Sequence, residues 1–282
     1  MIIYEIHWDP SIGIDLGFIT LRYYSLMFLI AFAGGYQIMK KIFKAEGLKQ
    51  EVLDKILVYT IVGTLLGARL GHVIFYQAEL FLQDPLSVFL PFQFVPEVKF
   101  TGFRGLASHG AAIGIFIAMI LFSKKILKRH VLWILDRIVL PVSFGAIFVR
   151  IGNFLNSEIV GKPTNSDYGV VFVQLGENFP RHPAQLYESI SYLVLFSILY
   201  IIYWKTKRSQ TLGFLFGLFF TLLWTIRFFV EYMKAPQVPE RADWLFNTGQ
   251  LLSLPLIALG VLLLILAVNK KIGTTTSKNH SS

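Results

Sequence analysis

The sequence of 282 residues contains no cysteine. Disulfide bonds, metal sites built on thiolates and a cysteine nucleophile of the protein's own are therefore excluded. Charged residues are also scarce, at 15% of the chain against about 25% in an average soluble domain. Because 55% of the residues are hydrophobic, the composition excludes both a disordered chain and an ordinary soluble fold.

Long hydrophobic runs are abundant, and seven of them are long enough, or nearly so, to cross a bilayer. A bilayer core of roughly 30 Å requires about 20 helical residues. We therefore predict an all-α, polytopic integral membrane protein. The predicted spans are Phe18–Met39, Ile56–Gln77, Leu106–Ser123, Val131–Val149, Leu186–Trp204, Leu212–Val230 and Gln250–Val268.

Neither an internal repeat nor a linker divides the chain, so we predict one transmembrane domain over residues 1–270. Residues 1–17 lack the basic region of a signal peptide and predict a short segment before the first span. The polar residues 271–282 predict a disordered cytoplasmic tail.

The net charge of +9 does not form one basic surface. Fifteen of the 26 lysine and arginine residues follow the first, third, fifth or seventh predicted span, and basic residues mark cytoplasmic loops. Seven spans then place the N-terminus outside and the C-terminus in the cytoplasm. Because the positive charge mostly orients the chain, the composition argues against a nucleic-acid partner.

Charges inside a span cost about 2.5–3.5 kcal/mol each on insertion scales, so each requires a reason. Most costly groups lie in the outer half of the membrane, and Asp136 and Arg137 are the exceptions. A conducting path needs polar groups through the full thickness, whereas a site reached from the outer leaflet needs them at one depth. The sequence therefore predicts an arginine-rich pocket at outer-leaflet level, suited to a phospholipid phosphate.

A first polar motif follows the fourth predicted span, in an expected outer loop. It runs from Arg150 to Glu158 and includes Asn153 and Asn156. We expect Gly152 to allow an unusual backbone path there.

A second polar motif precedes the fifth predicted span. Pro183 stands where a helix could begin. His182, Gln185 and Glu188 recur at intervals of three, which predicts that the three side chains point to one side.

Taken together, the motifs resemble those of the bacterial prolipoprotein diacylglyceryl transferase family. The resemblance covers about residues 20–268, and the order and spacing of the segments make it specific. The chain differs at Ala111 and Ser157, where family members often have glycine. The matching segments are Tyr23-Tyr24-Ser-Leu-Met, Gly67-Ala-Arg69-Leu-Gly71, Asp84-Pro85, Ser108-His-Gly110, Arg150-Ile-Gly-Asn153 with Asn156 and Glu158, Arg181-His-Pro183, Gln185-Leu-Tyr-Glu188, Arg227–Glu231, and Gly249-Gln250 with Ser253 and Pro255.

The resemblance implies a transferase of the bacterial cytoplasmic (inner) membrane whose active site faces the outer leaflet. Family members transfer diacylglyceryl from phosphatidylglycerol to the lipobox cysteine of a prolipoprotein signal peptide, the first step of lipoprotein maturation. The products are a thioether and glycerol phosphate. The resemblance implies neither a cofactor nor a metal. The family's essential positions correspond here to Tyr24, His109, Arg150, Asn153, Glu158, Arg227 and Glu231.

For that reaction we expect Arg150 and Arg227 to bind the phosphate. Glu231, four residues after Arg227, would hold its guanidinium, although the two could instead form a purely structural ion pair. We expect Asn153 and Glu158 to bind the glycerol hydroxyls or to orient Arg150.

His109 is the candidate general base for the thiol, because an imidazole titrates near neutral pH. It could instead orient the substrate or serve as a packing residue. Tyr24 is expected to be catalytic, although an aromatic belt would also explain it. The remaining substrate-binding candidates are Asn156, Arg69, His182, Gln185 and Glu188.

Three other classes of function compete with the transferase. A transporter or channel for an anionic metabolite or lipid headgroup predicts polar groups in both halves of the spans. An intramembrane protease would need a nucleophile motif that is absent, and the adjacent Ser108 and His109 do not make a catalytic pair. A non-enzymatic scaffold would not need two dense polar motifs.

Overall fold

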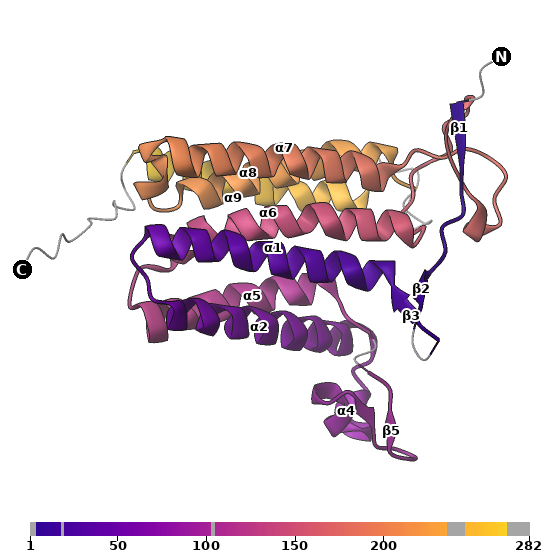
Figure 1. Cartoon of the computed structure of the whole chain (residues 1–282), viewed down its shortest axis with the longest axis horizontal. Helices are drawn as coiled ribbons and strands as arrows, with labels where there is room; N and C mark the ends of the chain where they lie inside the picture. The colour runs from indigo at the N-terminus through magenta and orange to yellow at the C-terminus, as the bar shows by residue number, and fades with distance from the viewer. Residues whose placement is uncertain (1–3, 18–19, 103–104, 236–245, 270–282) are drawn as a thin grey trace, which may run out of the picture. The chain divides into compact units, whose positions relative to one another are not determined.

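The computed structural model describes residues 4–17, 20–102, 105–235 and 246–269 (Figure 1). Within these residues, seven helices are long and apolar enough to cross a membrane, which confirms the predicted fold class. The predicted tail at residues 271–282 lies outside the described residues. The spanning helices are α1 (Tyr23–Ala45), α2 (Gln50–Tyr76), α5 (Ser108–Phe122), α6 (Val131–Leu155), α7 (Ala184–Lys205), α8 (Phe214–Val230) and α9 (Thr248–Val268).

The chain divides into two compact units, Met1–Met39 with Leu135–Ser282, and Lys40–Ile134. The first unit contains most of α1 and α6, all of α7 to α9 and four short strands. The second contains α2, α5, two short helices and a small hairpin. The further elements are β1 (Tyr4–Trp8), β2 (Gly13–Asp15), β3 (Thr20–Arg22), α3 (Leu80–Gln83), α4 (Pro85–Phe89), β4 (Phe92–Gln93), β5 (Lys99–Phe100) and β6 (Tyr168–Phe172).

Helix α6 is longer than the fourth predicted span, because it continues to Leu155. Arg150 and Asn153, expected in a loop, therefore lie on its last turns, where they are three residues apart and meet on one face. Gly152 is helical and does not provide the unusual backbone path that we expected. Its lack of a side chain instead lets Tyr24 approach, since a Cβ there would lie 2.9 Å from the Tyr24 ring.

In the second unit, α2 and α5 pack backbone against backbone (Figure 1). A Cβ added at Gly67 would lie 2.4 Å from the Gly110 carbonyl oxygen. Small residues permit this close approach, which stabilises helix pairs in membranes. The Ala107 amide also donates to the Ala68 carbonyl at 2.9 Å. The start of α5, which carries His109, is therefore fixed against α2.

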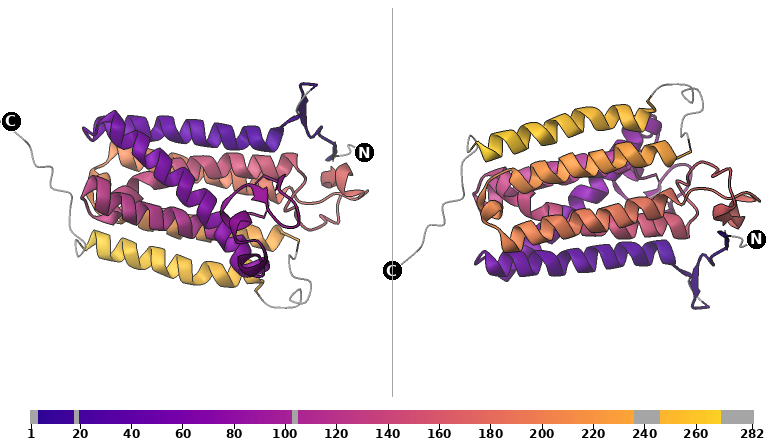
Figure 2. Two further views of the ribbon diagram at one scale, coloured as in Figure 1. Left: turned by 90° about the horizontal axis from the view of Figure 1, so that it is seen from below. Right: turned by 90° about the horizontal axis from the view of Figure 1, so that it is seen from above.

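In the first unit, α8 packs against both α7 and α9 (Figure 2). The N-terminus of α8 is capped from α6 by Asp136, a residue with 1% exposure. Its carboxylate accepts from the Gly213 amide at 2.7 Å and the Phe216 amide at 2.9 Å. Helix N-termini leave amide donors unpaired and favour a negative charge. This intramembrane carboxylate therefore has a structural explanation.

A small sheet fixes the other end of α6. Strand β1 pairs in parallel with β6, from Tyr4–Tyr168 to Trp8–Phe172. The Trp8 ring lies 4.5 Å from that of Phe154, and its Nε1 donates to the Phe154 carbonyl at 3.1 Å. The last turn of α6 is thus anchored by aromatic packing.

A backbone ladder joins three segments of the first unit. The Gly161 amide donates to the His182 carbonyl at 3.0 Å, and the Lys162 amide donates to the Met233 carbonyl at 2.7 Å. A Cβ at Gly161 would lie 2.3 Å from the first oxygen and 2.7 Å from the second. Only glycine fits between these two backbone segments. The ladder therefore fixes the loop after α6, the start of α7 and the end of α8 together.

Candidate functional site

The centre of the polar cluster in the first unit is Glu188 on α7, whose side chain has 0% exposure. Its Oε2 lies 2.9 Å from Arg150 Nε on α6. Its Oε1 lies 2.9 Å from Lys234 Nζ, just after α8. A buried carboxylate inside a membrane span is costly unless cations compensate it. Two cations from two other segments do so here.

Lys234 also lies against a second carboxylate, with its Nζ 3.3 Å from Glu231 Oε2. The sequence predicted Arg227 as the partner of Glu231, but the ion pair that the described residues give Glu231 is with Lys234. The reason is local. Helix α8 ends at Val230 and continues as a 3₁₀ turn over Glu231–Met233, and the three-residue period of such a turn brings residues i and i+3 together.

Two amides connect Arg150 to a further carboxylate. Arg150 Nη1 donates to Asn153 Oδ1 at 3.1 Å, and Asn153 Nδ2 donates to Glu158 Oε2 at 3.1 Å. Asn156 Nδ2 donates to Glu158 Oε1 at 3.2 Å. Gln185 Nε2 on α7 donates to the Glu158 carbonyl at 2.6 Å. Arginine, amides and carboxylate therefore form one connected network.

The backbone around Glu158 is strained. Ser157 and Ile159 have φ angles of 53° and 55°, in the left-handed region that glycine adopts readily and a β-branched residue rarely. This explains why glycine would suit the position of Ser157. Such strain persists only where the surroundings hold it, and it concentrates at functional sites.

Arg227 lies close to this network. Both Arg150 and Arg227 are near enough to the Tyr192 hydroxyl to act on it electrostatically, and that hydroxyl donates to Glu188 Oε1 at 3.4 Å. In the described part of the chain, the contact that Arg227 makes is with the Trp224 ring, at 5.6 Å from its centroid. Its guanidinium is therefore available to an anion.

Tyr24, at the start of α1, completes this group. Its side chain lies beside Asn153 and within electrostatic range of Glu158 and Arg150. The cluster as a whole carries three cations and three carboxylates, so its formal charge is balanced. The charged members are Arg150, Arg227, Lys234, Glu158, Glu188 and Glu231.

His182 does not join the cluster, contrary to its predicted alignment with Gln185 and Glu188. Its Nδ1 lies 3.2 Å from the Tyr187 hydroxyl, and its ring packs edge-on against Tyr168. Helix α7 begins at Ala184, so helical periodicity does not extend back to His182.

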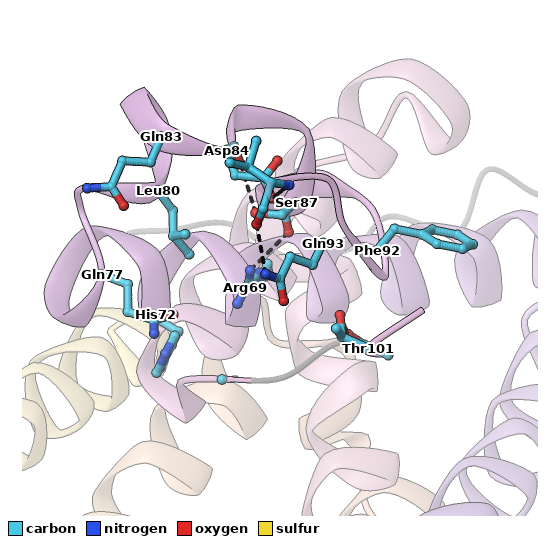
Figure 3. A pocket seen from close by; sticks show the side chains of 13 residues that line it. Arg69, His72, Gln77, Leu80, Gln83, Asp84, Ser87, Phe92, Gln93 and Thr101 are labelled. Atoms are coloured by element: carbon cyan, nitrogen blue, oxygen red, sulfur yellow. Dashed lines mark hydrogen bonds between the residues drawn. The ribbon is translucent and has the colours of Figure 1, made fainter. Parts of the chain in front are cut away.

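Arg69 and His109 belong to the second unit. Arg69 is 8% exposed and donates to the Ser87 carbonyl at 2.9 Å. It lines a cavity of about 590 Å³ together with His72, Asp84 and three glutamines (Figure 3). His109 is exposed on the first turn of α5. The polar side chains that line this cavity are three amides, two hydroxyls, a carboxylate, an imidazole and a guanidinium.

Two members of the cluster were missed by the sequence reasoning. Lys234 could have been found from its spacing to Glu231, three residues apart beyond the apolar run. Tyr192 lies four residues after Glu188, on the same helix face, but within an apolar stretch it is indistinguishable from a packing residue.

Comparisons with known proteins agree with the motifs. A profile of the family "Prolipoprotein diacylglyceryl transferase" matches residues 11–266. A protein of Tolumonas auensis named phosphatidylglycerol–prolipoprotein diacylglyceryl transferase is 41% identical over 263 residues, 93% of this chain and 97% of the relative. Proteins of the same name from Chloroherpeton thalassium and Bacteroides fragilis are 36% and 35% identical, and the matches cover 94% and 95% of this chain and 95% and 97% of the relatives. The chain therefore belongs to the prolipoprotein diacylglyceryl transferase family.

Proposed function

We propose that this chain transfers the diacylglyceryl group of phosphatidylglycerol to the thiol of the lipobox cysteine of a prolipoprotein. The observation that carries the proposal is the match, over nearly the whole chain, to relatives that bear the name of this activity. The relatives give the transporter alternative no support. Seven spanning helices make the chain a multi-pass membrane protein, and we assign it to the bacterial cytoplasmic membrane.

The chemistry sets two requirements. The sulfur forms a bond to a glycerol carbon as the bond from that carbon to a phosphate oxygen breaks, which releases glycerol phosphate. The thiol must first lose its proton, because a free thiol has a pKa of about 8.5 and only the thiolate is nucleophilic. The departing phosphate gains negative charge, which preorganised donors stabilise.

We assign the phosphate to Arg150 and Arg227. Guanidinium groups present a planar set of donors that matches phosphate oxygens. Arg150 forms an ion pair with Glu188 through Nε and a hydrogen bond to Asn153 through Nη1, and both contacts restrict its guanidinium before a substrate arrives. The hydrogen bond from Arg150 to Asn153 favours an orienting role for that amide. Glu158, with Asn156, remains for the glycerol hydroxyls of the headgroup.

We further propose that the cluster faces the outer leaflet. In the first unit it lies at the ends of α6, α7 and α8 opposite to the end at which α7 runs into Lys205, Lys207 and Arg208. Lysine and arginine mark the cytoplasmic side.

Labelling of single cysteines tests this orientation, since the chain has no cysteine of its own. Lys162 and Lys125 are both exposed. We expect Lys162→Cys to react with an impermeant maleimide added to intact cells, and Lys125→Cys to react only after permeabilisation. The reverse pattern would contradict the proposed orientation.

Transfer in vitro tests the function itself. Purified chain in phosphatidylglycerol vesicles is incubated with a lipobox peptide that has either cysteine or serine at the acceptor position. We expect a diacylglyceryl thioether on the cysteine peptide, one glycerol phosphate released per product, and no reaction of the serine peptide. Transfer to both peptides would contradict thiol chemistry, and transfer to neither would refute the function.

The two arginines should each be required for turnover. Because each donates to the charge that develops on the phosphate, we expect Arg150→Ala and Arg227→Ala to lower kcat by about 100- to 1,000-fold. Arg129→Ala, which removes a guanidinium stacked 4.5 Å from the Trp133 ring, is the matched control and should keep the wild-type rate. Near-normal turnover in both arginine variants, at normal protein levels, would remove the phosphate assignment.

The proposed base role of His109 is tested by the dependence of the rate on pH. We expect the wild-type rate to rise with pH, because only the unprotonated form of a general base accepts the proton of the thiol. In His109→Gln the rise should follow the titration of the thiol itself, at about pH 8.5. His130→Gln, in the loop before α6, should leave the profile unchanged. A His109→Gln profile of wild-type shape would exclude His109 as the titrating group.

A further inference from the structure

We propose that Lys234 is a positioning residue of the transfer reaction, which acts through Glu188 on the guanidinium of Arg150. The proposal rests on the proposed function, since it assigns a role within the same site. Within the described residues, the ammonium of Lys234 contacts none of Arg150, Arg227, Asn156 and Glu158, the groups proposed above to bind the lipid. Its ammonium instead contacts Glu188 Oε1 at 2.9 Å, while the other oxygen of that carboxylate contacts Arg150 Nε at 2.9 Å.

Because the three side chains are buried, the orientation of the Glu188 carboxylate depends on the ammonium of Lys234. The side chains of Lys234 and Glu188 are 2% and 0% exposed, and that of Arg150 is 14% exposed. Water therefore cannot replace the ammonium as the partner of Oε1. Without the ammonium, Glu188 would turn both oxygens to the donors that remain, namely Arg150 and Tyr192. The guanidinium of Arg150 would then no longer keep the orientation in which it donates to Asn153.

Backbone contacts fix the position from which the Lys234 side chain extends. Lys234 forms an antiparallel bridge with Gly161, and the Ala235 amide donates to the Val160 carbonyl at 3.3 Å. These contacts continue the ladder that joins the loop after α6 to the end of α8. A long, flexible side chain loses rotamer freedom when it is buried, and it is held here by two carboxylates at its tip.

Charge balance supports the same conclusion. With Lys234, three cations face three carboxylates in the cluster, and Glu188 and Glu231 share the one ammonium. Without it, Glu188 and Glu231 would repel each other, and both would compete for the arginines that we assign to the phosphate. Lys234 therefore keeps two carboxylates away from the guanidinium donors that an incoming phosphate requires.

Three variants test the proposal in the transfer assay, namely Lys234→Met, Lys234→Arg and Lys162→Met. We expect Lys234→Met to lower kcat/KM by about 100-fold, as misplacement of a binding group by an ångström does. The loss should fall mainly on kcat, since the phosphate charge is greatest in the transition state. Lys234→Arg, which retains a cation between the carboxylates, should recover most of the activity. The exposed Lys162→Met is the control and should match the wild type.

The double variant Lys234→Met with Glu188→Gln distinguishes the proposed positioning role of Lys234 from a purely structural role. It removes one cation and one carboxylate together, so it should regain the thermal stability that Lys234→Met loses. We expect transfer to stay low, because a neutral amide does not hold Arg150 as a carboxylate does. Recovery of transfer together with stability would overturn the proposal, as would a Lys234→Met enzyme within twofold of the wild type.

A second measurement does not depend on transfer. The rate at which phenylglyoxal modifies Arg150 in the folded protein is followed by mass spectrometry. We expect faster modification in Lys234→Met than in the wild type, and the wild-type rate in Lys234→Arg. If the wild-type chain shows no transfer, the proposed function is refuted. The modification rate still tests whether Lys234 positions Arg150 through Glu188. An unchanged rate in Lys234→Met would overturn that role.

Discussion

A carboxylate with no exposed surface inside a membrane span must be compensated by cations, and Glu188 imposes this constraint on the first unit. Its two oxygens contact Arg150 from α6 and Lys234 from beyond α8. Three segments far apart in sequence are therefore joined at one point by charge. The motifs that contain Arg150, Glu188 and Glu231 are separate along the chain, and within the first unit they meet around this carboxylate.

The backbone makes that meeting possible. Gly161 lies between the carbonyl groups of His182 and Met233, where a side chain would not fit. The ladder through Gly161 joins the same three segments that Glu188 joins by charge. Arg150 is thereby held from several sides before any lipid arrives, and a preorganised donor stabilises developing charge without reorganisation. In the proposed function, stability and catalysis draw on the same contacts.

The number of spans was predictable because bilayer thickness sets helix length, and apolar runs reveal it. The family was predictable because the order and spacing of the motifs resemble it, and the comparisons confirm it. The partner of Glu231 was not, since the change from an α-helix to a 3₁₀ turn after Val230 alters which residues meet. Lys234 was missed for a different reason, because its contacts with Glu188 and Gly161 join segments that are far apart in sequence. The cap that Asp136 forms on α8 likewise joins residues 77 positions apart.

The central claim is that the cluster around Glu188 receives the phosphate of the lipid. The most direct measurement is a structure of the chain in a nanodisc with phosphatidylglycerol bound. We expect phosphate oxygens within hydrogen-bonding distance of both Arg150 and Arg227, with Arg150 still paired to Glu188. A headgroup whose phosphate touches neither arginine, for example one bound in the cavity beside Arg69, would contradict it.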